Sequence, residues 1–152
     1  MIKIRAYQQK DIPSMIDIAR ALPQWFDEDA RQRAIPIDLR FQDGYVAEMD
    51  GELIGFITLY VAEGRVNIGW MGVHPSHGRQ GIGTKLIAAA EAYCREIGVY
   101  QLATYTLGDS VEYPPYEATR AFYVKQGFEV YQRSQTDNPG CPEEIKLKKS
   151  II

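Results

Sequence analysis

The sequence predicts an α/β (α+β) fold in which one mixed β-sheet is flanked by helices. Two patterns indicate this fold class. Short segments with alternating apolar and polar residues recur along the chain, as in half-buried strands. Between them lie longer segments with apolar residues three or four positions apart, as in amphipathic helices. The chain has 152 residues, of which 45% are hydrophobic, so we expect a single domain over residues 1–152.

The N-terminal part of the chain predicts a strand followed by helices. Residues 2–6 alternate and indicate the first strand. A helix is expected from Asp11, whose carboxylate can cap free amides, to Pro23, which ends it. Residues 24–41 have a mixed pattern, in which residues 27–30 predict the start of a second, irregular helix.

Three antiparallel strands are predicted next. Residues 45–49 and 53–61 are rich in β-branched and aromatic residues, and they flank Asp50-Gly51, a strong signal for a hairpin turn. Glu63-Gly64 predicts a second turn. The chain then returns in a strand over residues 66–73.

The remaining elements alternate between helix and strand. Apolar residues recur on one face from Gly81 to Gly98, which predicts a helix that ends at a glycine. A strand is expected next, at residues 99–106, followed by a long loop at 107–115. A helix at 118–126 and two strands, at 128–132 and 145–147, complete the chain. The sheet would therefore have about six to seven strands.

Composition argues against several classes of protein. The formal net charge is −3 and no basic stripe is evident, so we expect no nucleic acid as partner. No run of about eighteen apolar residues or signal peptide is apparent, so we expect no membrane association and a cytoplasmic location. In that compartment Cys94 and Cys141 should be reduced thiols. No cluster of His, Cys and Asp has the spacing of metal ligands, and we expect no metal.

A glycine-rich turn, Gly78-Arg79-Gln80-Gly81-Ile82-Gly83-Thr84, connects the strand over residues 66–73 to the following helix. Glycines at 81 and 83 allow a tight bend and close approach of a ligand to the backbone. The first amides of the helix are unpaired, and the helix dipole favours negative charge there, so a pyrophosphate suits this position. Arg79 and Lys85 could add positive charge, and the Thr84 hydroxyl could donate one more hydrogen bond.

Glycine spacing alone leaves the purpose of this turn open. A simple strand-to-helix connection explains the two glycines equally well. A mononucleotide loop would need Gly-Lys-Ser/Thr, whereas this chain has Gly83-Thr84-Lys85. A dinucleotide site would need a further glycine and an acidic residue about twenty positions on, and neither is evident.

Two segments resemble a known family. Val73-His74-Pro75, followed by Gly81-Ile82-Gly83-Thr84-Lys85-Leu86, is similar to the acetyl-CoA-binding motif of the GCN5-related N-acetyltransferases, the GNAT superfamily. Residues 120–128, Arg-Ala-Phe-Tyr-Val-Lys-Gln-Gly-Phe, resemble that family's late helix with its Tyr-x-x-x-Gly-Phe ending. Two positions depart from the family pattern: Gly78 stands where the family usually has Arg or Gln, and Tyr116 where it often has Asn.

The resemblance implies a particular sheet and a particular cofactor. The GNAT sheet is mixed and mainly antiparallel, with two parallel strands that splay apart, here the strand ending at Val73 and the strand through residues 102–104. Acetyl-CoA would lie in that gap, with its pyrophosphate on the glycine-rich turn. The expected cofactor contacts are Met71, Gly72, Val73, Arg79, Gln80, Gly81, Ile82, Gly83, Thr84 and Tyr123.

Catalytic roles follow from the same resemblance. The family's tyrosine at the position of Tyr123 approaches the sulfur of CoA, so Tyr123 is the candidate acid for the leaving thiolate. The alternative is a core tyrosine that packs beside Phe122. The amine must lose a proton before it attacks, and the candidate bases are Glu117 and Glu112, with Asp109 as a further acidic candidate. Two histidines, at 74 and 77, lie near the turn, and we expect a histidine there to cap the strand end or face water and not to serve as the base.

The acceptor pocket should form from the least regular segments. Residues 25–29, Trp-Phe-Asp-Glu-Asp, and tyrosines 105, 113 and 116 combine aromatic rings with carboxylates, which suits a cationic amine. The candidate substrate-binding residues are Trp25, Phe26, Glu28, Tyr105 and Tyr116. A hydrophobic plug with an acidic helix cap is an equally good interpretation.

Together these observations predict an N-acetyltransferase that moves an acetyl group from acetyl-CoA to a primary amine by direct attack. The amine would belong to a small molecule or to a peptide N-terminus. The alternatives are a non-catalytic acyl-CoA-binding or regulatory module, and an interaction domain that uses aromatic patches and no cofactor. Family habit adds the expectation of a homodimer.

Overall fold

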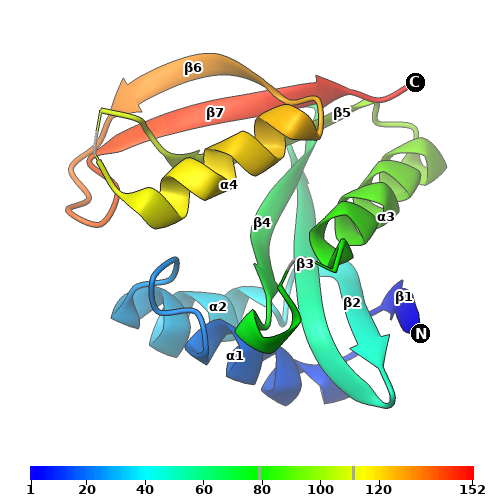
Figure 1. The fold of residues 1–152 in the computed structure, drawn as a ribbon. Helices are drawn as coiled ribbons and strands as arrows, with labels where there is room; N and C mark the ends of the chain where they lie inside the picture. The colour runs from blue at the N-terminus through cyan, green and yellow to red at the C-terminus, as the bar shows by residue number, and fades with distance from the viewer. Residues whose placement is uncertain (79, 111) are drawn as a thin grey trace.

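In the computed structural model, seven strands form one sheet in the order β1-β2-β3-β4-β5-β7-β6 (Figure 1). The structure describes residues 1–78, 80–110 and 112–152. The strands are β1 (Ile2–Ala6), β2 (Asp43–Met49), β3 (Glu52–Ala62), β4 (Arg65–Val73), β5 (Gln101–Leu107), β6 (Glu129–Gln135) and β7 (Glu143–Ser150). The α-helices are α1 (Ile12–Arg20), α2 (Ile35–Asp38), α3 (Ile82–Ile97) and α4 (Pro114–Lys125). All neighbouring strands are antiparallel except β4 and β5, which confirms the predicted fold class.

Both predicted turns of the first three-stranded section are present. Asp50 and Gly51 have φ angles of 52° and 83°, and Glu63 and Gly64 have φ angles of 56° and 73°. Two consecutive left-handed residues match the right-handed twist of the strands that a two-residue hairpin joins. These local turns bring β2, β3 and β4 side by side.

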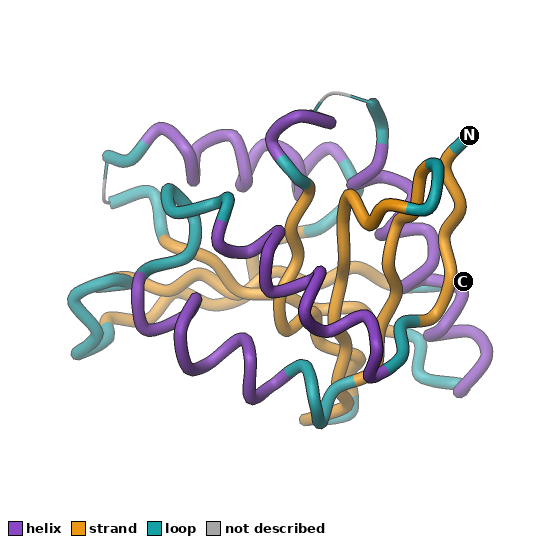
Figure 2. The backbone as a smooth tube through the Cα atoms, turned by 90° about the horizontal axis from the view of Figure 1, so that it is seen from below, coloured by secondary structure: helices purple, strands orange, loops and turns teal. Residues whose placement is uncertain are grey.

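Helices cover both faces of the sheet. Val46 and Phe56 pack with α1 and α2, whereas Ala47 and Ile57 belong to the core under α3. Successive side chains of a strand point to opposite faces, so these neighbours in sequence divide between two cores. In Figure 2, which views the molecule from below, α1 and α2 lie in front of the strands.

Local prediction was wrong for the start of α4 and for the length of the last strands. The helix begins at Pro114 and not at residue 118, because proline is tolerated in a first turn, where its missing N–H has no helical partner. β6 and β7 extend beyond the predicted 128–132 and 145–147, since they pair with each other from Glu129–Lys148 to Gln135–Glu143.

The first helices also correct one prediction and confirm another. Asp11 does not cap the amides of α1 through its side chain. Its carboxylate accepts from the Gln8 amide at 2.8 Å and from the Arg5 guanidinium at 2.9 Å, and Arg5 holds the pKa of Asp11 below its usual value. The predicted irregular second helix is present as a π-helical turn, Ala30–Ala34, that continues into α2.

The parallel strands β4 and β5 separate soon after they meet, as expected. Their pairing consists of Val66 with Leu102 and Asn67 with Ala103. Beyond these positions β4 continues to pair with β3 on its other side as far as Val73, and β5 pairs with β7 as far as Leu107. The two strands therefore diverge toward their C-terminal ends, which leaves a gap in the sheet.

Candidate active site

The backbone of β4 offers hydrogen-bonding groups to this gap. The amide of His74 donates to the carbonyl of Ile54 on β3 at 2.8 Å. Residues of an antiparallel strand alternate between facing the partner strand and facing away from it, so Gly72 also directs its backbone groups to β3. Met71 and Val73 then direct theirs to the side of β5, where the ladder has ended at Asn67. An extended ligand could pair with these groups as a strand would.

The glycine-rich turn places the N-terminus of α3 at the end of the gap. Gly81 has a φ angle of 75° and precedes the helix, whose first internal hydrogen bond runs from the Lys85 amide to the Gly81 carbonyl. The amides of Ile82, Gly83 and Thr84 come before that bond and have no helical carbonyl to pair with. Together with the dipole of this long helix they form a site that favours an anion.

Gly83 has a packing role that the spacing of glycines in the turn did not predict. A Cβ atom on Gly83 would lie 3.2 Å from Phe122 Cζ and 3.3 Å from Met71 Cε. Its lack of a side chain therefore lets α3 approach both α4 and β4. At the same end, the Gln126 side-chain amide donates to the Thr84 hydroxyl at 3.0 Å, which joins the end of α4 to the turn.

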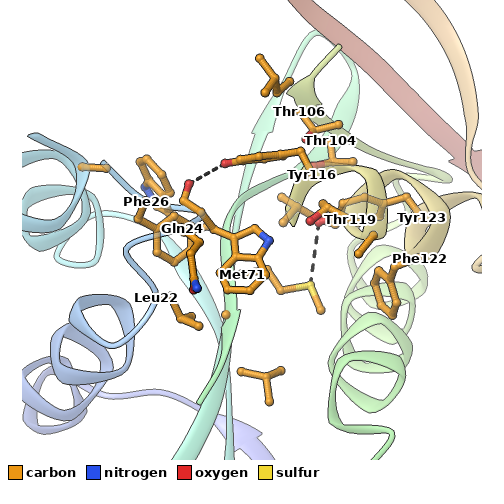
Figure 3. Close-up of a pocket in the computed structure, with 18 of the residues that line it drawn as sticks. Leu22, Gln24, Phe26, Met71, Thr104, Thr106, Tyr116, Thr119, Phe122 and Tyr123 are labelled. Carbon is orange, nitrogen blue, oxygen red and sulfur yellow. Dashed lines mark hydrogen bonds between the residues drawn. The ribbon is translucent and has the colours of Figure 1, made fainter. Parts of the chain in front are cut away.

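Tyr123 lies on α4 with its hydroxyl beside the gap. The side chain is 6% exposed, and its hydroxyl is 3.9 Å from the sulfur of Met71 (Figure 3). Its ring packs against Phe122 and Phe128, with centroids 5.4 Å and 5.2 Å away. Burial raises the pKa of Tyr123 to about 12, and the Thr104 hydroxyl acts weakly in the opposite direction. The phenol is therefore a protonated hydrogen-bond donor at neutral pH.

A pocket of about 1170 Å³ extends from the β4–β5 gap to the segment between α1 and α2. The predicted residues that line it are Trp25, Phe26, Met71, Gly72, Val73, Gly81, Ile82, Gly83, Thr84, Tyr105, Tyr116 and Tyr123. Of these, Ile82 also belongs to the core under α3. The structure therefore brings together most residues that the sequence singled out for cofactor and substrate.

Other predicted residues lie elsewhere. Gln80, Glu28, Glu112 and Glu117 are exposed and do not line this pocket. The Glu28 carboxylate accepts instead from Gln32 at 3.3 Å, on the surface. Arg79 lies outside the described residues.

Of the remaining titratable candidates, Asp109 and His74 have hydrogen-bond partners, whereas His77 lines the pocket. Asp109 forms a 2.8 Å ion pair with Arg133, which lowers the pKa of its carboxyl. His74 accepts from the Ser76 amide through Nδ1 at 3.1 Å, in the capping role foreseen for it. His77 lines the pocket, and its Nδ1 is buried without a partner among the described residues.

The charged residues of the lining divide between the two ends of the pocket. At the first-helix end, the described lining residues include the carboxylates of Asp27 and Asp29. Asp29 is paired with Arg33 at 2.8 Å, whereas Asp27 uses one oxygen to accept from the Ala30 amide at 2.8 Å. Lys125 lines the pocket near the end of α4. The end of the pocket near Lys125 therefore suits an anionic ligand, and the end near Asp27 suits a cationic ligand.

Comparison with known proteins identifies the family. A family model for the acetyltransferase (GNAT) domain matches residues 41–130, which contain β2 to α4 and both motifs that the sequence singled out. The chain belongs to the GNAT acetyltransferase family.

Solved structures agree with this GNAT assignment at the level of the fold. A protein from Desulfovibrio desulfuricans, described as a GNAT-family acetyltransferase, aligns with a TM-score of 0.84 and 19% identity over 100% of both chains. The ribosomal-protein-S18-alanine N-acetyltransferase of Escherichia coli aligns with a TM-score of 0.74 and 16% identity, over 99% of this chain and 94% of its own. A GNAT acetyltransferase from Elizabethkingia anophelis with acetyl-CoA bound has a TM-score of 0.75 and 20% identity, over 98% and 97% of the two chains. A search of curated proteins found no match.

Sequence reasoning missed several lining residues of this GNAT pocket. Trp70 on β4 packs edge-on against Phe26, with ring centroids 5.7 Å apart, and its indole N–H donates to Asp38 at 2.9 Å. Thr104 and Thr106 on β5 are both 6% exposed and both line the pocket. Their alternation within the otherwise apolar end of that strand was the signal that could have found them.

Within residues 1–78, 80–110 and 112–152, no group of three or more His, Cys, Asp or Glu side chains is placed to hold a metal ion. In the same part of the chain, each helix falls short of the length and apolar character needed to cross a bilayer.

Proposed function

We propose that this GNAT chain is an acetyl-CoA-dependent N-acetyltransferase that moves the acetyl group to a primary amine by direct attack. One observation carries the proposal: the hydroxyl of Tyr123 stands at the β4–β5 gap, in the same pocket as the free amides at the start of α3. A cofactor bound along the gap would have its phosphates near those amides and its thioester near the tyrosine.

The residues present fit such a cofactor without any specific side chain. The amides of Ile82, Gly83 and Thr84 would bind the pyrophosphate, because their donors are unpaired and the helix dipole favours negative charge. The backbone groups of Met71 and Val73 would bind the amides of the pantetheine arm in the manner of a neighbouring strand. Gly78, which replaces the family's usual Arg or Gln, takes no part in these backbone contacts.

The reaction forms one bond, breaks one bond, and moves protons at the amine, at the new amide nitrogen and at the leaving sulfur. The neutral amine nitrogen attacks the thioester carbonyl carbon, the C–N bond forms, and the C–S bond breaks as the thiolate leaves. Tyr123 is the proposed donor to that thiolate, since burial keeps its phenol protonated at neutral pH. Before the attack the amine reaches its neutral form by giving a proton to water or to a carboxylate at the pocket. After the attack the nitrogen, now bonded to the acetyl carbon, loses a second proton, and an equivalent proton from water restores the phenol of Tyr123.

The charge pattern of the pocket supports an amine as the acceptor. Asp27 lies at the acceptor end with aromatic rings from Trp25 and Phe26, and a primary ammonium group is attracted by both kinds of group. This class includes small-molecule amines and peptide N-termini.

The test combines cofactor binding with turnover. We expect acetyl-CoA to raise the melting temperature and a panel of primary amines to release CoA. Tyr123→Phe should lower kcat by about 100-fold while the Kd for acetyl-CoA changes by less than about twofold, because the ring still packs against Phe122 and Phe128. Tyr100→Phe is the matched control, since Tyr100 is 56% exposed and does not line the pocket. Unchanged kcat in Tyr123→Phe would rule out Tyr123 as the acid.

A second candidate function is a non-catalytic acyl-CoA-binding or regulatory module. The position of Glu112 and Glu117 outside the pocket favours it, because neither predicted base faces the site. A thermal shift with acetyl-CoA but no CoA release from small amines, polyamines or peptides would support this alternative. Absence of any shift at millimolar acetyl-CoA would contradict both functions.

A further inference from the structure

The acceptor end of the pocket is crossed by hydrogen bonds between two segments about ninety residues apart in sequence. The Tyr113 hydroxyl donates to the Gln24 carbonyl at 2.6 Å, and the Tyr116 hydroxyl donates to the Trp25 carbonyl at 2.5 Å. In the reverse direction, the Trp25 indole N–H donates to the Pro115 carbonyl at 3.1 Å. We call this set of three hydrogen bonds the tyrosine strap.

The strap joins opposite walls of the pocket. Its first side is the segment between α1 and α2, and its second side is the first turn of α4. Figure 3 shows Tyr116 extending across the pocket, with its hydroxyl directed toward the side of Gln24 and Phe26. The rings of Tyr113 and Tyr116 lie 5.8 Å apart, so they form one aromatic wall.

The loop between β6 and β7 forms a third wall of the acceptor end of the pocket. The loop is held by its own hydrogen bonds: the Gly140 amide donates to Asn138 Oδ1 at 2.9 Å, and the Cys141 amide donates to the Asn138 carbonyl at 3.0 Å. A Cβ atom on Gly140 would lie only 3.0 Å from Asp27 Oδ2, so this loop comes close to the segment between α1 and α2. Asn138, Gly140 and Cys141 all line the pocket.

An extended peptide needs a channel that continues past its reacting amine. Each residue of extended chain adds about 3.3 Å, so the second and third residues of a peptide acceptor would need about 7–10 Å beyond the N-terminus. The strap, together with the close approach of the Gly140 loop to Asp27, surrounds the acceptor end from which such a chain would leave. A peptide would have to break the strap to pass.

We infer that the acceptor is a compact primary amine with an apolar or aromatic body, and that the tyrosine strap excludes polypeptides. This inference rests on the proposed acetyltransferase function and narrows its acceptor. The reacting nitrogen would lie at the Tyr123 hydroxyl, where the thioester is proposed to bind, and the charge of Asp27 farther along the pocket would attract the cation. The body would pack among Trp25, Phe26 and Trp70. The Thr106 hydroxyl, buried without a partner among the described residues, is available to a polar atom of the same ligand.

The first measurement compares two acceptors on the wild-type protein. Initial rates of CoA release are measured with phenethylamine and with a hexapeptide that has a free N-terminus and no lysine. We expect kcat/KM for phenethylamine to exceed that for the hexapeptide by about tenfold or more, because the peptide acts only in the fraction of molecules with an open strap. Equal or greater efficiency with the hexapeptide would overturn the inference and leave the proposed function intact.

The second measurement removes the strap hydroxyls and keeps the rings. In the double variant Tyr113→Phe/Tyr116→Phe, the hexapeptide-to-phenethylamine ratio of kcat/KM should rise by about tenfold, since the two tyrosine hydrogen bonds no longer oppose opening. Tyr100→Phe should leave the ratio unchanged. A ratio unchanged in the double variant would also overturn the inference. If the double variant fails to show a thermal shift with acetyl-CoA, the two single variants are compared in its place, with a rise of a few fold expected in each.

Failure of the two proposals can be told apart. No thermal shift with acetyl-CoA would reject the proposed function and, with it, the identity of the acceptor. A thermal shift with turnover of the hexapeptide alone would reject only the compact acceptor. A shift without turnover of either acceptor, or of any amine in the wider panel, would reject the acetyltransferase and support the binding module.

Discussion

Gly81 and Gly78 lie three positions apart in the same turn, and the backbone requires glycine at only one of them. Gly81 has a φ angle of 75°, in the left-handed region that residues with a Cβ rarely adopt. Gly78 has a φ angle of −63°, and a Cβ there would meet nothing closer than the Pro75 carbonyl at 3.8 Å. Gly81 therefore fixes the direction in which the first amides of α3 point, and Gly78 does not.

We expect Gly81→Ala to lower the free energy of unfolding by about 1–2 kcal/mol, the cost of a left-handed residue with a Cβ. The Kd for acetyl-CoA should rise as well, because the turn relaxes and the amides of Ile82 and Gly83 shift. Urea unfolding and calorimetric titration measure the two effects. The matched variant, Gly78→Ala, should change stability by no more than about 0.5 kcal/mol. Equal losses in both variants would contradict this account of the turn.

At the scale of elements, an irregularity between β3 and β4 shapes the entrance to the pocket. The register of the two strands shifts between Ile57 and Leu59, and the intervening Thr58 is fully buried. Its hydroxyl accepts a 2.7 Å hydrogen bond from the amide of Trp70, which satisfies a backbone group that the bulge leaves without a ladder partner. The bulge therefore sets the orientation of Trp70, which lines the pocket.

Thr58→Val keeps the side-chain shape and removes this acceptor. The free energy of unfolding should fall by about 1–3 kcal/mol, since the Trp70 amide is left buried without a partner. Chemical denaturation followed by tryptophan fluorescence measures the loss. Thr58→Ser retains the hydroxyl and should recover the part of the loss that is due to the hydrogen bond. If the Ser variant is no more stable than the Val variant, the hydroxyl does not have the role described.

At the scale of the whole molecule, buried and half-buried tyrosines connect distant parts of the fold. The Tyr7 hydroxyl lies 2.7 Å from the Leu39 carbonyl and 2.6 Å from the Gln42 carbonyl, and its single hydrogen is shared between these two acceptors. It therefore ties the end of β1 to the end of α2. Tyr116 belongs to the strap, and Tyr123 lies between α4 and the gap. Burial raises the pKa of each of these three tyrosines to about 12.

These raised pKa values predict alkaline destabilisation. An unfolded tyrosine ionises near pH 10, so above that pH the unfolded chain loses protons that the folded chain retains. The contribution of these protonated tyrosines to the free energy of unfolding is complete below pH 10, and it is lost as the pH rises toward 12. The free energy of unfolding should therefore fall between pH 10 and pH 12, as measured by urea denaturation across a pH series. The double variant Tyr7→Phe/Tyr123→Phe should show a smaller slope, and the same slope as the wild type would contradict the assignment.

The sequence determined the features that depend on neighbouring residues. Asp50-Gly51 and Glu63-Gly64 specify left-handed turns locally, and the hairpins that they predict are present. Apolar spacing and flanking glycines gave α3 nearly its observed bounds, Ile82–Ile97. The two GNAT motifs were recognisable because they hold their spacing within single strand–turn–helix or helix–turn units. The start of α4 was missed because a proline pair fits a loop and a first helical turn equally well.

Only the tertiary structure decided which chemical groups share the pocket. Trp70, Thr104 and Asp27 meet there from two strands and a helix connection, and no local pattern specifies such a meeting. Glu112 and Glu117, which are close in sequence to the strap tyrosines, face the solvent instead. The physical reason is that side-chain periodicity fixes the face of an element, whereas a pocket depends on how distant elements pack. The local sequence therefore set the cofactor turn, and packing between segments about ninety residues apart set the strap that we propose selects the amine.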